Sequence, residues 1–65
     1  MITTRYGVDV KPLSTIRDAR GNITHVVCDR LPDHATREYP LFDLRADDGI
    51  AEILKAVAEL PSVQS

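Results

Sequence analysis

The sequence predicts an α+β fold in which a three- to four-stranded antiparallel sheet is packed on one face by a single C-terminal amphipathic helix. Two patterns support this fold class. Polar and apolar side chains alternate near the start of the chain, as expected for a strand with one buried face. Near its end, apolar residues recur at spacings of three and four, which is typical of a helix that packs on a sheet. A chain of 65 residues is expected to form a single domain, 1–65, with a small core.

The first strand is predicted over about residues 2–10. Its proposed inward-facing set is Ile2, Thr4, Tyr6, Val8 and Val10. Pro12 cannot donate a hydrogen bond to a neighbouring strand, so it is expected to mark the end of this strand or an edge position before the next one.

Two further strands are predicted over about 13–18 and 22–30, joined by a tight turn. Asp18 can accept hydrogen bonds from nearby backbone N–H groups, and Gly21 can adopt the positive φ that such a turn requires. The segment from Asp18 to Asn22 therefore predicts a β-hairpin.

The pairing in this hairpin decides which side chains are buried. If Asp18 lies opposite Asn22, then Ser14 lies beside Val26 and Ile16 beside Thr24. This register predicts one face that packs on the helix, formed by Ile16, Val26 and Cys28, and an opposite face that carries Leu13, Ile23 and Val27.

A fourth strand is predicted over about 37–44, and Pro40 inside it indicates an edge strand. The helix is predicted over about 48–60, with Asp47 or Asp48 accepting hydrogen bonds from its first N–H groups. Its apolar stripe is Ile50, Ile53, Leu54, Val57 and Leu60. Pro61 is expected to end the helix, and residues 61–65 to form a frayed tail.

Cysteine usage and hydropathy suggest a compartment. A single cysteine, Cys28, cannot form an internal disulfide, which favours a reducing cytoplasm. The N-terminal residues do not resemble a signal peptide, and no apolar stretch approaches membrane-spanning length. We therefore expect a cytoplasmic protein that does not bind a membrane.

The residues that could carry chemistry are few. His25, Cys28 and His34 lack the spacing of a zinc site, and the glycines do not form a phosphate-binding loop. The sequence therefore predicts no catalytic, cofactor or metal site, no direct binding of nucleic acid, and a protein that is not an enzyme.

Acidic residues distinguish the second half of the chain. The formal net charge is −2, and residues 29–65 carry eight acidic and four basic side chains. The candidate partner-binding residues are Asp29, Asp33, Glu38, Asp43, Asp47 and Asp48. They either form an ordinary solvated surface or mimic the phosphates of DNA and dock on a basic groove of a partner protein.

In its short length, acidic balance and unpaired cysteine, the chain resembles the small phage-encoded anti-CRISPR inhibitors as a class. This resemblance implies a stoichiometric inhibitor that binds a nucleic-acid-binding effector complex, a bacterial CRISPR surveillance complex, in the host cytoplasm and blocks DNA recognition. We expect a monomer, with a homodimer as the alternative.

A second hypothesis concerns the sheet face that the helix does not cover. Leu13, Ile23 and Val27 could form an exposed apolar patch there. The chain would then be a structural or regulatory subunit that self-associates or binds a partner through this patch.

Overall fold

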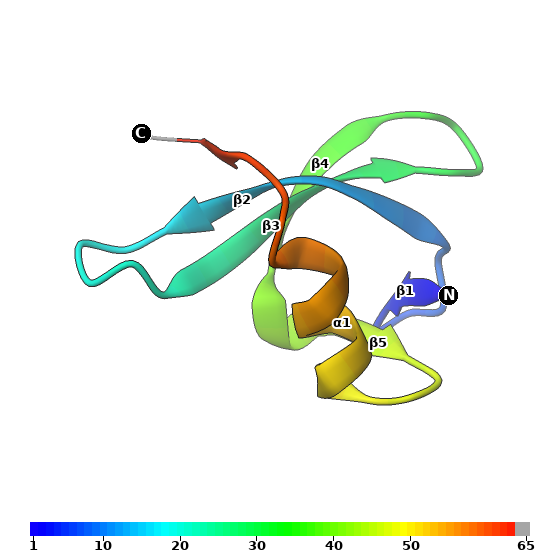
Figure 1. Cartoon of the computed structure of the whole chain (residues 1–65). Coiled ribbons are helices and arrows are strands. Elements are labelled where there is room, and N and C mark those ends of the chain that lie inside the picture. Colours follow the sequence, from blue (N-terminus) through cyan, green and yellow to red (C-terminus); the bar gives the residue numbers. More distant parts are fainter. Residues whose placement is uncertain (64–65) are drawn as a thin grey trace.

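A computed structural model describes residues 1–63 and confirms the α+β class, with antiparallel strands and a C-terminal helix that packs against them (Figure 1). The elements in chain order are β1 (Ile2–Thr4), β2 (Val10–Arg17), β3 (Ile23–Arg30), β4 (Thr36–Pro40), the 3-10 turn η1 (Leu41–Asp43), β5 (Leu44–Ala46), α1 (Ile50–Val57) and β6 (Ser62–Val63).

The strands form two sheets instead of one. β4, β3 and β2 are an antiparallel meander, and the short β6 adds to the outer side of β2 in parallel. β1 and β5 form a separate antiparallel pair. α1 lies below the meander and beside β5, so the core is enclosed between the two sheets and the helix (Figure 1).

The first predicted strand, 2–10, is interrupted. β1 ends at Thr4, whose side-chain Oγ1 accepts hydrogen bonds from the N–H groups of Tyr6 and Val8, both at 3.3 Å. These bonds hold a turn between β1 and β2, and the chain changes direction there. Val10 opens β2, and Pro12 lies within β2 instead of ending a strand. In the described residues only β3 pairs with β2 at Pro12, which agrees with the edge alternative.

The predicted hairpin turn between β2 and β3 is confirmed. Asp18 Oδ1 accepts hydrogen bonds from the N–H groups of Arg20 (2.9 Å) and Asn22 (3.0 Å). Gly21 has a φ of 83°, in the left-handed region that a residue without Cβ adopts at low cost. Local side-chain chemistry is therefore enough to fix this turn.

The predicted register holds next to the turn, where Arg17 pairs with Ile23, and is wrong by one residue from Ile16 to Ser14. Val26 pairs with Thr15 instead of Ser14, because the register shifts between Ile16 and Arg17 and leaves Thr24 as an extra residue on β3. Thr15 is consequently fully buried, whereas the predicted Ile16 is half-buried on the other face. Val26 and Cys28 do face the core, as predicted.

This bulge and a second register shift change the other face of the sheet; the second shift lies between Pro12 and Ser14 and leaves Leu13 as an extra residue on β2. Ile23, predicted on that face, packs against the core, while Val27 is half-buried and Leu13 is 40% exposed. The apolar patch predicted from Leu13, Ile23 and Val27 is therefore smaller than expected.

The segment predicted as one strand over 37–44 contains two strands. β4 ends at Pro40, η1 reverses the chain, and β5 then pairs with β1. β4 is the last strand of its sheet, which confirms the edge position that Pro40 predicts. The two short strands belong to different sheets. The alternation of polar and apolar residues along this segment does not reveal the difference.

α1 is shorter than the predicted 48–60 and buries a narrower stripe. Ile53 and Val57 are buried in the core, whereas Ile50 and Leu54 are 54% and 44% exposed. The other buried apolar residues of the core are Ile2, Val10, Val26, Cys28 and Leu44. Among residues 1–63, no helix has the length and apolar character required to cross a membrane.

The ends of α1 also differ from the prediction. The residue that precedes its first turn is Gly49, with no side-chain hydrogen bond to the helix N-terminus, so neither Asp47 nor Asp48 caps it. Instead, Glu52 Oε1 accepts a hydrogen bond from the N–H of Asp48 at 3.2 Å. The predicted frayed tail is wrong for Ser62 and Val63, which form β6; its last residues, 64 and 65, lie outside the described part of the chain.

Candidate functional site

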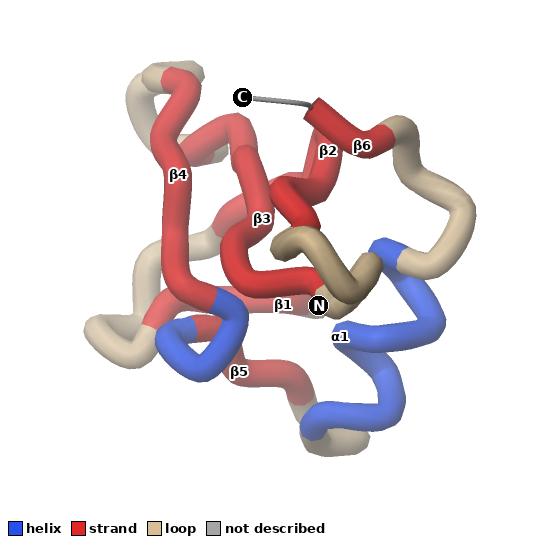
Figure 2. Tube along the Cα trace, turned by 90° about the vertical axis from the view of Figure 1, so that its left-hand side faces the viewer, coloured by secondary structure: helices blue, strands red, loops and turns tan. Residues whose placement is uncertain are grey.

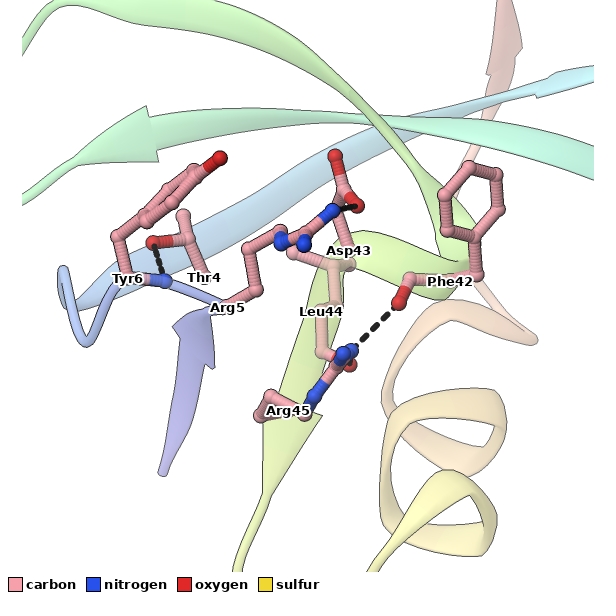
Figure 3. Close-up of polar contacts among 7 residues, drawn as sticks. All are labelled: Thr4, Arg5, Tyr6, Phe42, Asp43, Leu44 and Arg45. Carbon is pink, nitrogen blue, oxygen red and sulfur yellow. Dashed lines mark hydrogen bonds and ion pairs between the residues drawn. The ribbon is translucent and has the colours of Figure 1, made fainter.

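The pairing of β1 with β5 brings together two segments that are distant in sequence. Thr4 lies opposite Leu44, so Arg5 and Tyr6, which follow β1, lie near Asp43 and Phe42, which precede β5. Arg5 Nη1 is 3.5 Å from Asp43 Oδ1 (Figure 3). The Arg5 guanidinium also lies over the Tyr6 ring, 5.4 Å from its centroid, within range of a cation–π interaction.

Two aromatic rings flank this ion pair and are largely exposed. Tyr6 is 82% exposed and Phe42 is 72% exposed, and both rings point to the same side in the view of Figure 3. The η1 turn that presents Phe42 is held by Arg45, whose Nη1 donates hydrogen bonds to the carbonyl oxygens of Phe42 and Leu44. These bonds hold the backbone that carries the Phe42 ring.

A pocket of about 370 Å³ adjoins these residues. The turn between β1 and β2, the end of β3, and the segment from β4 into η1 form its walls. It is lined by Thr4, Arg5, Tyr6, Val8, Arg30, Glu38, Tyr39, Pro40 and Asp43. We refer to Arg5, Tyr6, Phe42 and Asp43, together with this pocket, as the Tyr6–Phe42 face.

The charges of the pocket are balanced, because Arg5 and Arg30 are matched by Glu38 and Asp43. Two buried polar atoms at its wall, Arg30 Nε and Asp43 Oδ1, make no hydrogen bond within residues 1–63, but Asp43 Oδ1 forms the ion pair with Arg5 Nη1. Buried polar atoms usually have a partner, so Arg30 Nε is the atom at this wall that residues 1–63 leave unpaired.

The six predicted partner-binding acids do not form one array. Asp29 and Asp33 lie at the connection between β3 and β4, where Asp29 Oδ2 is 3.2 Å from His34 Nδ1 and Asp33 Oδ2 is 3.6 Å from Arg30 Nη1. Glu38 and Asp43 line the pocket, and the exposed Asp47 and Asp48 precede α1. Three of the six, Asp29, Asp33 and Asp43, thus lie beside cationic or titratable groups of the same chain.

The cysteine and histidines occupy separate positions. Cys28 is buried in the core, and burial raises the pKa of its thiol to about 11, so the thiol stays protonated near neutral pH. His25 lies on the opposite face of β3, with Nδ1 3.0 Å from Thr24 Oγ1. Cys28 therefore has the environment of a packing residue.

Arg5, Tyr6 and Phe42 are not among the partner-binding residues predicted from the sequence. Alternation assigned Tyr6 to the inner side of a continuous strand, and Phe42 fell inside another predicted strand. The available signal was Gly7, which directly follows Tyr6 and indicates a turn.

Comparisons with protein-family models, with curated proteins and with solved structures find no match to this chain. The function is therefore inferred from the residues and their geometry.

Proposed function

We propose that this protein is a non-enzymatic binding protein that docks on a protein partner through the Tyr6–Phe42 face. The observation that carries the proposal is the pair of exposed aromatic rings on either side of the Arg5–Asp43 ion pair, beside a pocket. Aromatic and arginine side chains contribute most of the binding energy in protein interfaces.

The face is already organised before a partner arrives. The Arg5 guanidinium lies over the Tyr6 ring, and Arg45 holds the backbone that carries Phe42. Groups that are fixed in advance lose less conformational entropy on binding, so each contact contributes more to the affinity. Arg30 Nε, which makes no hydrogen bond within residues 1–63, supports the same conclusion, because a partner group would satisfy it after a small side-chain rearrangement.

For the partner, we propose a bacterial CRISPR surveillance complex, which the protein would inhibit by blocking a basic DNA-binding groove. The negative net charge and the exposed Asp47 and Asp48 support this choice. The ion pairs of Asp33 and Asp43 reduce the charge that these two residues offer to a partner. The aromatic contacts are therefore proposed to supply affinity, and the acidic residues to steer association and choose the partner.

Replacing Tyr6 by Ala is expected to weaken partner binding by about 2 kcal/mol or more, roughly 30-fold. Phe42→Ala should have a similar effect. Both side chains are mostly exposed, so the fold should be retained. Binding can be measured by interferometry on a panel of purified CRISPR surveillance complexes, with Leu13→Ala, a variant of an exposed residue outside this face, as the control.

Wild-type affinity in both aromatic variants would show that the face is not used. If no complex in the panel binds the wild-type protein, the proposed target class is wrong.

Replacing Asp29, Asp33, Glu38, Asp43 and Asp47 together by their amides tests the acidic contribution. We expect weaker binding to the complex and a smaller dependence of the affinity on salt, because fewer ionic contacts form. Circular dichroism checks that the fold is retained, and Glu59→Gln, which removes an exposed carboxylate after α1, is the matched single-charge control. Full inhibition by the amide variant would exclude the charge-mimic mechanism.

A further inference from the structure

The outer edge of β4 is open. β4 is the terminal strand in the order β4-β3-β2-β6, and its first three residues, 36–38, are exposed. In Figure 2, β4 stands at the outside of the sheet with β3 on one side and no strand on the other. An open strand edge carries backbone N–H and C=O groups that can pair with another extended chain.

The register identifies these groups. The N–H of Arg30 donates to the C=O of Ala35 at 2.9 Å, so Ala35 directs its carbonyl toward β3. Backbone direction alternates along an antiparallel strand, and Arg37 and Tyr39 therefore also face β3. The outward-facing residues are Thr36, Glu38 and Pro40. Thr36 and Glu38 offer two N–H donors and two C=O acceptors, whereas Pro40 has no N–H and directs its C=O into the first turn of η1.

The pocket lies along the same strand. Glu38, Tyr39 and Pro40 contribute to its wall, opposite Tyr6 and Val8 from the turn after β1. A strand added beside β4 would place the side chain opposite Tyr39 on the face that Tyr39 occupies, which is the pocket side. The neighbouring residue of that strand would lie opposite Glu38 on the other face of β4, within reach of its carboxylate. Glu38 also lines the pocket, so the pocket extends to the edge of β4.

We propose that the edge of β4 binds an extended segment of the partner protein, with a Lys or Arg opposite Glu38 and an apolar side chain next to it in the pocket. This inference rests on the proposed function and names the chemistry of the partner segment. Backbone bonds to Thr36 and Glu38 would provide affinity, and the two side-chain positions would provide specificity.

Charge favours this occupant over a second copy of the chain. A symmetric β4–β4 pair centred on Glu38 would place two carboxylates directly opposite each other, which is destabilising. Its hydrogen bonds would also be reduced, because Pro40 donates none. A basic residue opposite Glu38 replaces this repulsion with an attraction.

The test uses a random library of peptides of about nine residues displayed on phage, selected on the full chain. We expect the selected peptides to carry a Lys or Arg adjacent to an apolar residue. Amide hydrogen exchange by NMR then reports the binding mode. The selected peptide, made synthetically, should slow exchange at Thr36 and Glu38 by roughly tenfold or more at saturation.

Glu38→Gln should weaken the binding of this peptide roughly two- to fivefold, and Glu59→Gln is the control. For a peptide with Ala in place of the basic residue, Glu38→Gln should leave the affinity unchanged. If the selected peptides bind but leave amide exchange at Thr36 and Glu38 unchanged, the proposal that a strand adds to β4 is wrong. If such peptides no longer bind the Tyr6→Ala variant, the proposal that the Tyr6–Phe42 face binds the partner is still supported. Failure to select any peptide also overturns the inference. The inference is also wrong if amide exchange at Thr36 and Glu38 slows in the free protein as its concentration rises, because this would indicate that β4 strands of two copies pair.

Discussion

Replacing Ile53 by Ala is expected to lower the free energy of unfolding by about 2–5 kcal/mol, the largest effect of any substitution considered for this fold. Ile53 is 1% exposed and lies in the core between the two sheets and α1. Removing its side chain loses buried apolar area and leaves a cavity. A chain of this size has a small stability margin, so much of the variant should be unfolded at ambient temperature.

The measurement is urea denaturation followed by circular dichroism at 222 nm. Leu54→Ala is the matched control, because Leu54 is adjacent in α1 and 44% exposed. We expect the control to lose less than about 1 kcal/mol. Equal losses in the two variants would contradict the orientation of α1.

Gly49→Ala is expected to destabilise the protein by about 1–3 kcal/mol. Gly49 adopts φ 80° and ψ −162°, a combination that is essentially restricted to glycine. A Cβ at this position would meet no atom within 4 Å, so the loss should come from the backbone conformation alone. Thermal unfolding of the variant provides the measurement.

Asp48→Ala distinguishes this explanation from a capping effect. Because α1 receives no side-chain cap bond, the substitution should change stability by less than about 0.5 kcal/mol. A loss of about 1 kcal/mol or more would indicate that Asp48 caps the helix in solution.

Features set by neighbouring residues were predictable from the sequence. The Asp18–Gly21 turn, the edge position of Pro40 and the helical burial of Ile53 and Val57 each follow from local chemistry. The register of the β2–β3 hairpin was not predictable in this way. Two extra residues, Thr24 on β3 and Leu13 on β2, shift the pairing between them, so that Thr15 instead of Ile16 lies in the core, and no local pattern marks either bulge.

The candidate site was less predictable than the fold. Acidic residues can be counted in a sequence, but the groups beside them depend on tertiary placement. Asp43 lies near Arg5 only because β1 pairs with β5. Tyr6 and Phe42 flank this pair for the same reason, so local periodicity could not identify the Tyr6–Phe42 face.

The β1–β5 pairing also has a consequence for the order of folding. β2, β3 and β4 are joined by short turns, whereas Thr4 and Leu44 are forty residues apart in sequence. Closing so long a loop costs more entropy than forming a hairpin, so we expect the meander to form first and β1 to join β5 late. Because this closure assembles Tyr6 and Phe42 on one surface, a partner that recognises both rings would select molecules that have completed folding and would stabilise them by mass action.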